Sequence, residues 1–158
     1  MKAVWLSVLV LCAAAMAQDT DPPYVDQVYP WDGEYDSYDD IVFHCIDEQS
    51  AIESDTIVFT LEDDTLGGGR TVRKAAGVPI SPTVLLPGDL YIDDTDPLDV
   101  ICTFDPKYPL AFDRTYTATV DGCLADIWGN EMGEDFVWRF GGMSVEETSW
   151  GEVKAREW

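Results

Sequence analysis

The stretch LAFDRTYTATVDGCLADIWGNEMGEDFVWRF, residues 110–140, is the most informative part of this chain. Leu110 precedes Tyr116 by six residues in a turn-rich segment. This is the spacing of a tyrosine corner, in which the ring packs on a β-sandwich core and the hydroxyl bonds to backbone a few residues upstream. Alternating apolar residues follow at 116–120 and again at 135–140, which is typical of half-buried strands. The stretch therefore predicts this corner and the last two strands of a sandwich.

Between these two strands, the segment DIWGN at 126–130 has the composition of a tight turn. Gly129 and Asn130 tolerate a positive φ angle, and the Asp126 side chain can accept hydrogen bonds from nearby backbone amides. An aspartate in such a turn is also a suitable cation ligand. The sequence leaves both interpretations open.

Short alternating strands precede this unit along the chain. They are expected at 24–29, 40–47, 55–61 and 98–104, each bounded by turn residues. The middle is less regular: residues 70–74 favour a hairpin or edge ribbon, and 81–92 one or two short strands. This spacing predicts an all-β, immunoglobulin-like or fibronectin III-like antiparallel sandwich of about seven strands.

The N-terminus has the pattern of a cleaved secretory signal. A lysine at position 2 precedes an apolar run at 3–11, and Ala15-Met16-Ala17 matches a cleavage site. The run is too short to span a bilayer, so the mature chain is expected to have no transmembrane segment. The predicted organisation is a signal peptide (1–17), an acidic lead-in (18–23), a sandwich (24–142) and a short C-terminal tail (143–158). The protein is therefore expected outside the cell, at the cell surface or in the periplasm.

The charge balance excludes some partners. The chain has 31 Asp and Glu residues against 9 Lys and Arg, a formal net charge of −22. Such a field repels phosphate backbones and anionic lipid surfaces, so neither nucleic acid nor a charged membrane is an expected partner. The carboxylates serve either solvation or the binding of divalent cations.

Calcium is the cofactor that the acidic turns would suit, although the fold requires none. Calcium takes about six to eight oxygen ligands, and aspartate-rich loops at the ends of a sandwich can supply them. Acidic clusters occur at 36–40, 47–48, 62–64 and 93–99. The expected site, if the chain has one, is formed by Asp93, Asp94 and Asp96.

Three cysteines remain after removal of the signal peptide: Cys45, Cys102 and Cys123. An odd number in an exported protein indicates one bridge and a spare thiol, or no bridge. Cys45 and Cys123 are expected near the same end of the sandwich, which favours a Cys45–Cys123 disulfide. Cys102 faces inward on its predicted strand and could instead pair with Cys45.

Nothing in the sequence points to catalysis. His44 is the only histidine, and it lies in the middle of a predicted strand, so a catalytic triad or a zinc site lacks partners. We therefore expect a non-enzyme. Aromatic residues on predicted turns either cap the core or contact a sugar or protein partner. They are Trp31, Tyr35, Tyr38 and Trp128.

Taken in order, these motifs resemble the bacterial immunoglobulin-like domain of S-layer proteins and surface adhesins. The similar pieces are the PWDG turn at 30–33, the FDP segment at 104–106, the Leu110 and Tyr116 pair, the DIWGN turn and the closing WRF at 138–140. The resemblance covers about residues 22–142. It implies a structural or adhesive role at the bacterial surface or in the periplasm, with surface proteins or glycans as partners.

The chain also departs from that family. Residues 62–97 are longer and more acidic than the usual middle of the domain, and one copy stands nearly alone where the family is usually repeated. The alternative function is therefore a calcium- or carbohydrate-binding module that uses the acidic end loops and the loop aromatics.

Overall fold

A computed structural model describes residues 19–31, 40–64, 69–74, 86–111 and 114–141. The expected signal peptide and the C-terminal tail lie outside these residues. The described chain forms one short 3-10 turn, η1 (Ser54–Thr56), and the strands β1 (Tyr24–Tyr29), β2 (Ile41–Ile46), β3 (Val58–Asp63), β4 (Gly69–Lys74), β5 (Gly88–Asp93), β6 (Asp99–Pro106), β7 (Thr115–Val120) and β8 (Phe136–Gly141).

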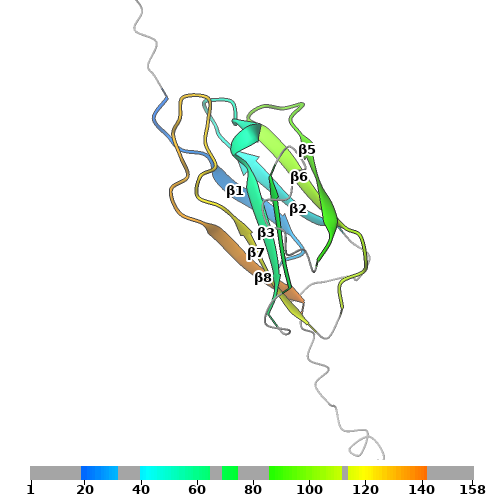
Figure 1. Ribbon diagram of the computed structural model, residues 1–158. Helices are drawn as coiled ribbons and strands as arrows, with labels where there is room; N and C mark the ends of the chain where they lie inside the picture. The colour runs from blue at the N-terminus through cyan, green and yellow to red at the C-terminus, as the bar shows by residue number, and fades with distance from the viewer. Residues whose placement is uncertain (1–18, 32–39, 65–68, 75–85, 112–113, 142–158) are drawn as a thin grey trace, which may run out of the picture.

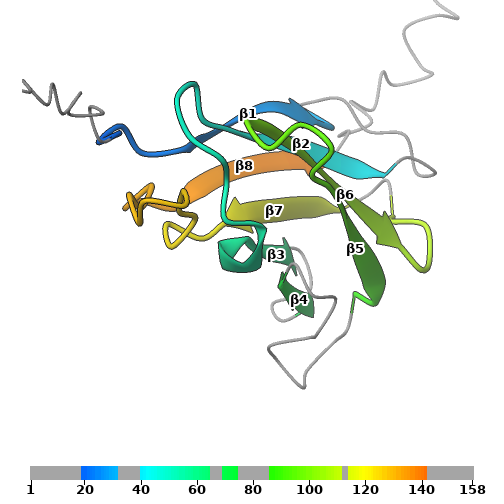
Figure 2. The ribbon, with the colours of Figure 1, turned by 90° about the horizontal axis from the view of Figure 1, so that it is seen from above.

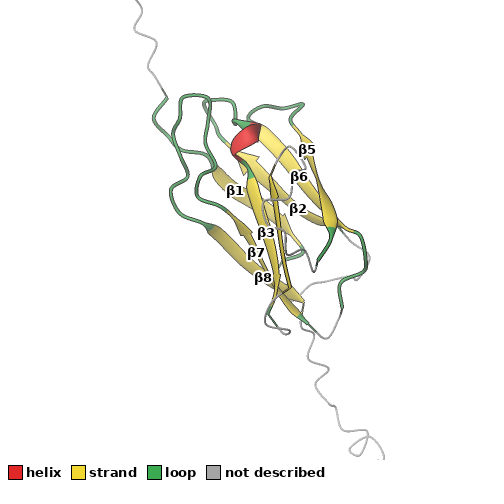
Figure 3. Ribbon diagram, in the orientation of Figure 1, coloured by secondary structure: helices red, strands yellow, loops and turns green. Residues whose placement is uncertain are grey.

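The strands form two antiparallel sheets that face each other, as Figures 1 and 2 show. One sheet has the order β1-β2-β6-β5 and the other β4-β3-β7-β8. Figure 3 shows that the described residues contain almost no helix. The predicted all-β sandwich is therefore confirmed. In the described part of the chain, no helix is long and apolar enough to cross a bilayer.

The core forms because successive side chains of a strand point to opposite faces. In β2, Ile41, Phe43 and Cys45 are fully buried, while the residues between them are half-buried. Buried residues from the other sheet complete the core, and they include Phe59 and Leu61 of β3, Tyr116 and Ala118 of β7, and Trp138 and Phe140 of β8. The alternation read from the sequence therefore assigns the inward faces correctly.

Aromatic contacts join the two sheets. The rings of Phe43 in β2 and Phe59 in β3 stack with their centroids 5.3 Å apart. Phe59 also contacts Phe104 of β6 at 5.3 Å. Pairs at these separations stabilise a core by roughly 0.5–1.5 kcal/mol beyond the area they bury.

The tyrosine corner is confirmed. Tyr116 is buried, and its hydroxyl oxygen accepts a hydrogen bond from the Ala111 N–H at 2.8 Å. Leu110, beside that amide, is also buried. The corner therefore fixes the approach to β7 as the sequence predicted.

The strand expected at 55–61 differs from the structure. Its first residues form η1, and β3 begins at Val58 and continues to Asp63. This extension carries the buried carboxylate of Asp63. Its Oδ2 lies 2.7 Å from Arg114 Nη1, which supplies an opposite charge. Of the irregular middle, β4 matches the expected ribbon and β5 covers the last part of 81–92, whereas residues 81–85 lie outside the described chain.

Candidate cation site at one end of the sandwich

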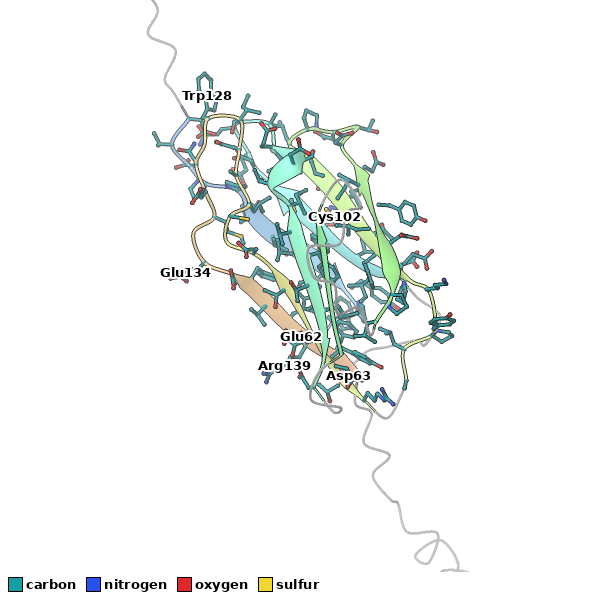
Figure 4. The ribbon with its side chains drawn as sticks, viewed as in Figure 1. Glu62, Asp63, Cys102, Trp128, Glu134 and Arg139 are labelled. Carbon is teal, nitrogen blue, oxygen red and sulfur yellow. The ribbon has the colours of Figure 1, made fainter. Side chains whose placement is uncertain are left out.

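Three aspartates from distant parts of the chain meet at one end of the sandwich. Asp19 belongs to the segment before β1, Asp47 follows β2, and Asp126 lies in the loop between β7 and β8. Each offers a carboxylate oxygen, and these oxygens all lie within 4.8 Å of one another. We call these three residues the aspartate triad. Figure 1 shows the N-terminal segment and the β7–β8 loop side by side at this end, and in Figure 4 Trp128 marks the tip of that loop.

The triad is buried beneath loops and not within the apolar core. The exposed fractions are 8% for Asp19, 3% for Asp47 and 2% for Asp126. None of the three belongs to the hydrophobic cluster that fills the space between the sheets. Buried carboxylates require hydrogen bonds or an opposite charge to offset the loss of water.

Hydrogen bonds satisfy Asp126. Its Oδ1 accepts the backbone N–H groups of Trp128 and Asn130, each at 2.8 Å. Its Oδ2 accepts the Ser50 hydroxyl and the Asn130 side-chain amide, each at 2.7 Å. Gly129 has φ at +84°, so the predicted turn is confirmed.

These contacts also set the charge of Asp126. Burial raises the pKa of its carboxyl, but the hydrogen bonds from Ser50, Asn130 and Trp128 together outweigh burial and lower the pKa below its usual value. Asp126 is therefore ionised at neutral pH.

Asp47 fixes a second turn. Its Oδ1 accepts the backbone N–H groups of Gln49 at 2.8 Å and Ser50 at 2.9 Å. The Ser50 hydroxyl lies 3.3 Å from Asp47 Oδ2 and donates to the nearer Asp126 Oδ2. Local turn geometry therefore accounts for both Asp47 and Asp126.

Turn geometry does not account for Asp19. Its Oδ1 accepts the Asp21 N–H at 3.0 Å, and its backbone carbonyl accepts the Asn130 amide at 3.2 Å. Its Oδ2 is buried and has no hydrogen-bond partner among the described residues. A buried polar atom without a partner costs roughly 1–3 kcal/mol, and more when the group is charged. An unpartnered carboxylate oxygen in an acidic cluster is a suitable ligand for a cation.

The described residues supply no counter-charge to the triad. Their ion pairs join His44 to Asp99, Arg114 to Asp63 and Arg139 to Asp64. Two like charges separated by 4.8 Å repel by roughly 3 kcal/mol at an effective dielectric constant of about 20. A bound cation would turn this repulsion into attraction.

The donor set suits a hard cation. The triad contains only oxygen ligands, with no histidine or cysteine, which favours calcium or magnesium over zinc. Ser50 Oγ and the Asp19 carbonyl are further oxygens beside it. Oxygens from three separate segments match calcium, which accepts irregular geometry, better than magnesium, which requires a near-octahedral shell.

The acidic turn expected to bind calcium lies elsewhere and has another organisation. Asp93, Asp94 and Asp96 are exposed. Asp93 Oδ1 accepts the hydroxyl of Thr95 at 2.6 Å and its N–H at 3.1 Å, which lowers the Asp93 pKa. Asp96 Oδ1 accepts the Leu98 N–H at 3.0 Å. Asp93 and Asp96 therefore shape a turn through their own hydrogen bonds, and the three carboxylates are not gathered as those of the triad are.

Sequence reasoning found part of the triad. It selected Asp126 as a turn residue with a cation alternative and noted the acidic pair at 47–48, but it did not select Asp19. The acidic character of the lead-in was the only available signal. Asp19 and Asp126 are 107 positions apart, and only the folded chain brings them together.

The expected Cys45–Cys123 disulfide is not formed. All three described cysteines are free: Cys45 and Cys102 are buried, and Cys123 is exposed. Cys45 lies inside the core beside Cys102 of the neighbouring strand β6, and the contact with Cys45 together with burial raises the pKa of Cys102. Cys123 does lie in the loop after β7, as expected, but its thiol is exposed and contacts the Thr56 carbonyl at 3.4 Å, whereas the Cys45 thiol is buried between the sheets.

The aromatic turn residues are exposed where the structure describes them. Trp31 and Trp128 each have more than half of their surface in solvent, so neither caps the core. Tyr35 and Tyr38 lie outside the described residues. His44 is half-buried in β2, and its Nδ1 lies 2.8 Å from Asp99 Oδ1.

No protein-family model, curated protein or solved structure matches this chain. The site is therefore interpreted from its own geometry.

Proposed function

We propose that this protein is a non-catalytic, exported module that binds calcium at one end of its sandwich. Its work is structural or adhesive, at the bacterial cell surface or in the periplasm. The observation that carries the proposal is the buried aspartate triad, with its unpartnered Asp19 Oδ2 and no basic partner among the described residues. The export signal and the acidic composition support it.

The immunoglobulin-like interpretation is part of the same proposal. The order β1-β2-β6-β5 corresponds to the ABED sheet of immunoglobulin-type sandwiches, and β3-β7-β8 corresponds to their CFG sheet. The tyrosine of the corner, Tyr116, lies at the start of the penultimate strand β7, where immunoglobulin-type sandwiches have it. Both features support the resemblance to bacterial surface domains.

Calcium would act by joining the segment that carries Asp19 to the loops that carry Asp47 and Asp126, which already hydrogen-bond to each other. A ligand that binds only the folded state stabilises it by RT ln(1 + [L]/Kd), which is about 2.7 kcal/mol at 100 times Kd. A module stiffened in this way would resist unfolding outside the cell, where calcium is plentiful.

The test is thermal unfolding of the purified protein in millimolar calcium and in excess chelator. We expect calcium to raise the midpoint by several degrees. Asp94→Asn is the matched control, because Asp94 is exposed and lies outside the triad, and it should keep the full calcium response. An identical midpoint in calcium and chelator for the native protein would refute calcium binding.

Trp128 supports the adhesive part of the proposal. Its ring is exposed at the tip of the β7–β8 loop, and its backbone N–H donates to Asp126 of the triad. An exposed indole can stack on a sugar or enter a pocket of a protein partner. A glycan-binding screen with the native protein and Trp128→Ala would test the sugar interpretation.

A further inference from the structure

We propose that Asp19 is the closing ligand of the calcium site, so that calcium fastens the N-terminal lead-in, residues 19–23, to the end of the sandwich. This inference rests on the proposed calcium binding and goes beyond it. Binding of the metal and docking of the lead-in would be one linked equilibrium.

The first step is that two of the three aspartates, Asp47 and Asp126, are held in place without the lead-in. Asp126 and Asp47 are held by their own turns, and Ser50 bridges them. These contacts keep two carboxylates side by side whether or not Asp19 is docked. The sandwich therefore presents an incomplete acidic site that is already organised.

The second step is that the lead-in is held by few contacts. Asn130 donates to the Asp19 carbonyl at 3.2 Å, and Gln49 donates to the Asp21 carboxylate. Thr20, Asp21 and Pro22 are exposed, so burial of this segment is limited mainly to its two ends. Hydrogen bonds of this kind contribute only about 0.5–1.5 kcal/mol each.

The third step concerns the sign of the electrostatic energy. Without a cation, docking brings a third carboxylate within 4.8 Å of two others and buries its Oδ2 without a partner. With a divalent cation, the same carboxylate completes the shell and its Oδ2 gains a partner. Calcium therefore changes the docking of Asp19 from unfavourable to favourable.

The experiment combines calcium affinity with hydrogen exchange at the lead-in. Affinity is measured by calorimetry, and exchange of the backbone amides of Thr20, Asp21, Tyr24 and Val25 is measured in calcium and in chelator. For the native protein we expect calcium to slow exchange of the Asp21 amide at least tenfold, because that amide donates to Asp19 Oδ1.

Three variants separate the possible outcomes. Asp19→Asn removes one charge with little change in shape, and it should weaken calcium binding at least tenfold and abolish the protection of the Asp21 amide. Asp94→Asn removes one charge from an exposed turn and should change neither quantity. Deleting residues 19–21 should weaken calcium binding as much as Asp19→Asn does, and circular dichroism would verify that each variant keeps its strands.

The outcomes distinguish this inference from the function on which it rests. If the native protein binds calcium, but Asp19→Asn binds equally well and the lead-in amides exchange at the same rate with and without metal, the closing role of Asp19 is refuted while calcium binding stands. If the native protein does not bind calcium, both proposals are refuted.

Discussion

The two ends of the sandwich bury carboxylates in opposite ways. Near the end where Asp63 and Arg139 are labelled in Figure 4, Asp63 is buried and Arg114 Nη1 lies 2.7 Å away. At the other end, near Trp128, the aspartate triad is equally buried and has no basic partner among the described residues. One end therefore has its counter-charge within the described chain. Under the proposed function, the other end would take its counter-charge from a calcium ion in solution.

The largest effect on stability is expected at the end of the sandwich where Asp63 pairs with Arg114. Arg114→Met would remove the Arg114 partner of the buried Asp63 carboxylate, and removing one partner of a buried pair costs roughly 3–5 kcal/mol. Because Arg114 is itself partly exposed, we expect the free energy of unfolding to fall by about 2–4 kcal/mol. Urea denaturation measures this loss, which should be the same in calcium and in chelator.

Arg139→Met is the control for that experiment. Arg139 is largely exposed, and its Nε lies 3.7 Å from Asp64, so its loss should cost less than about 1 kcal/mol. A loss at Arg139 as large as that at Arg114 would show that surface charge, and not the buried pair, stabilises this end.

The second effect is expected at the end of the sandwich that carries the aspartate triad. Asp126→Ala removes the acceptor of two backbone amides, the Ser50 hydroxyl and the Asn130 side chain. Buried donors left without partners cost roughly 1–3 kcal/mol, so we expect the free energy of unfolding in chelator to fall by about 2 kcal/mol. In calcium the loss should be larger, because the variant also forfeits the bound ion. Urea denaturation in both media gives the two values, and equal losses would show that Asp126 only shapes its turn.

These two ends also show what the sequence could predict. Strands, the Tyr116 corner and the turn at 126–130 were predicted well because each depends on residues close together in the chain. The Asp63–Arg114 pair and the triad depend on segments that meet only after the strands have paired, so no local pattern reveals them. Asp93, Asp94 and Asp96 attracted attention through density alone, yet adjacent acidic residues on one exposed turn mainly bond to their own backbone.

The pairing of the cysteines could not be predicted from the sequence for the same reason. The neighbour of Cys45 is set by the register of β2 against β6, in which Phe43 is opposite Cys102 and Cys45 is opposite Val100. A shift of one residue would turn Cys102 away from the core. Strand order and register are global properties, and the sequence fixes them only through the whole core.

A third, smaller effect is expected from acid. The folded-state pKa of Asp126 is lowered, so its carboxylate contributes stability that is present above the unfolded value of about 3.9 and is lost as the pH falls through the folded value. The native protein and Asp126→Asn, compared in chelator by urea denaturation, should therefore differ most near neutral pH. Their difference should shrink as the pH falls from neutral through the folded-state pKa of Asp126. A difference that does not change with pH would mean that Asp126 has an ordinary pKa in the folded protein.

The smallest effect is expected from Trp128, at the tip of the β7–β8 loop beside the triad. Trp128 contributes only its backbone N–H to the triad, and its ring is exposed, so Trp128→Ala should change the free energy of unfolding by less than about 0.5 kcal/mol. Calcium affinity should also be unchanged. Terbium, which occupies calcium sites, would report on the distance: excited through tryptophan, its luminescence should be strong in the native protein and much weaker in the variant. Unchanged luminescence would place the ion away from the β7–β8 loop, and both ends of the sandwich would then depend on the chain alone.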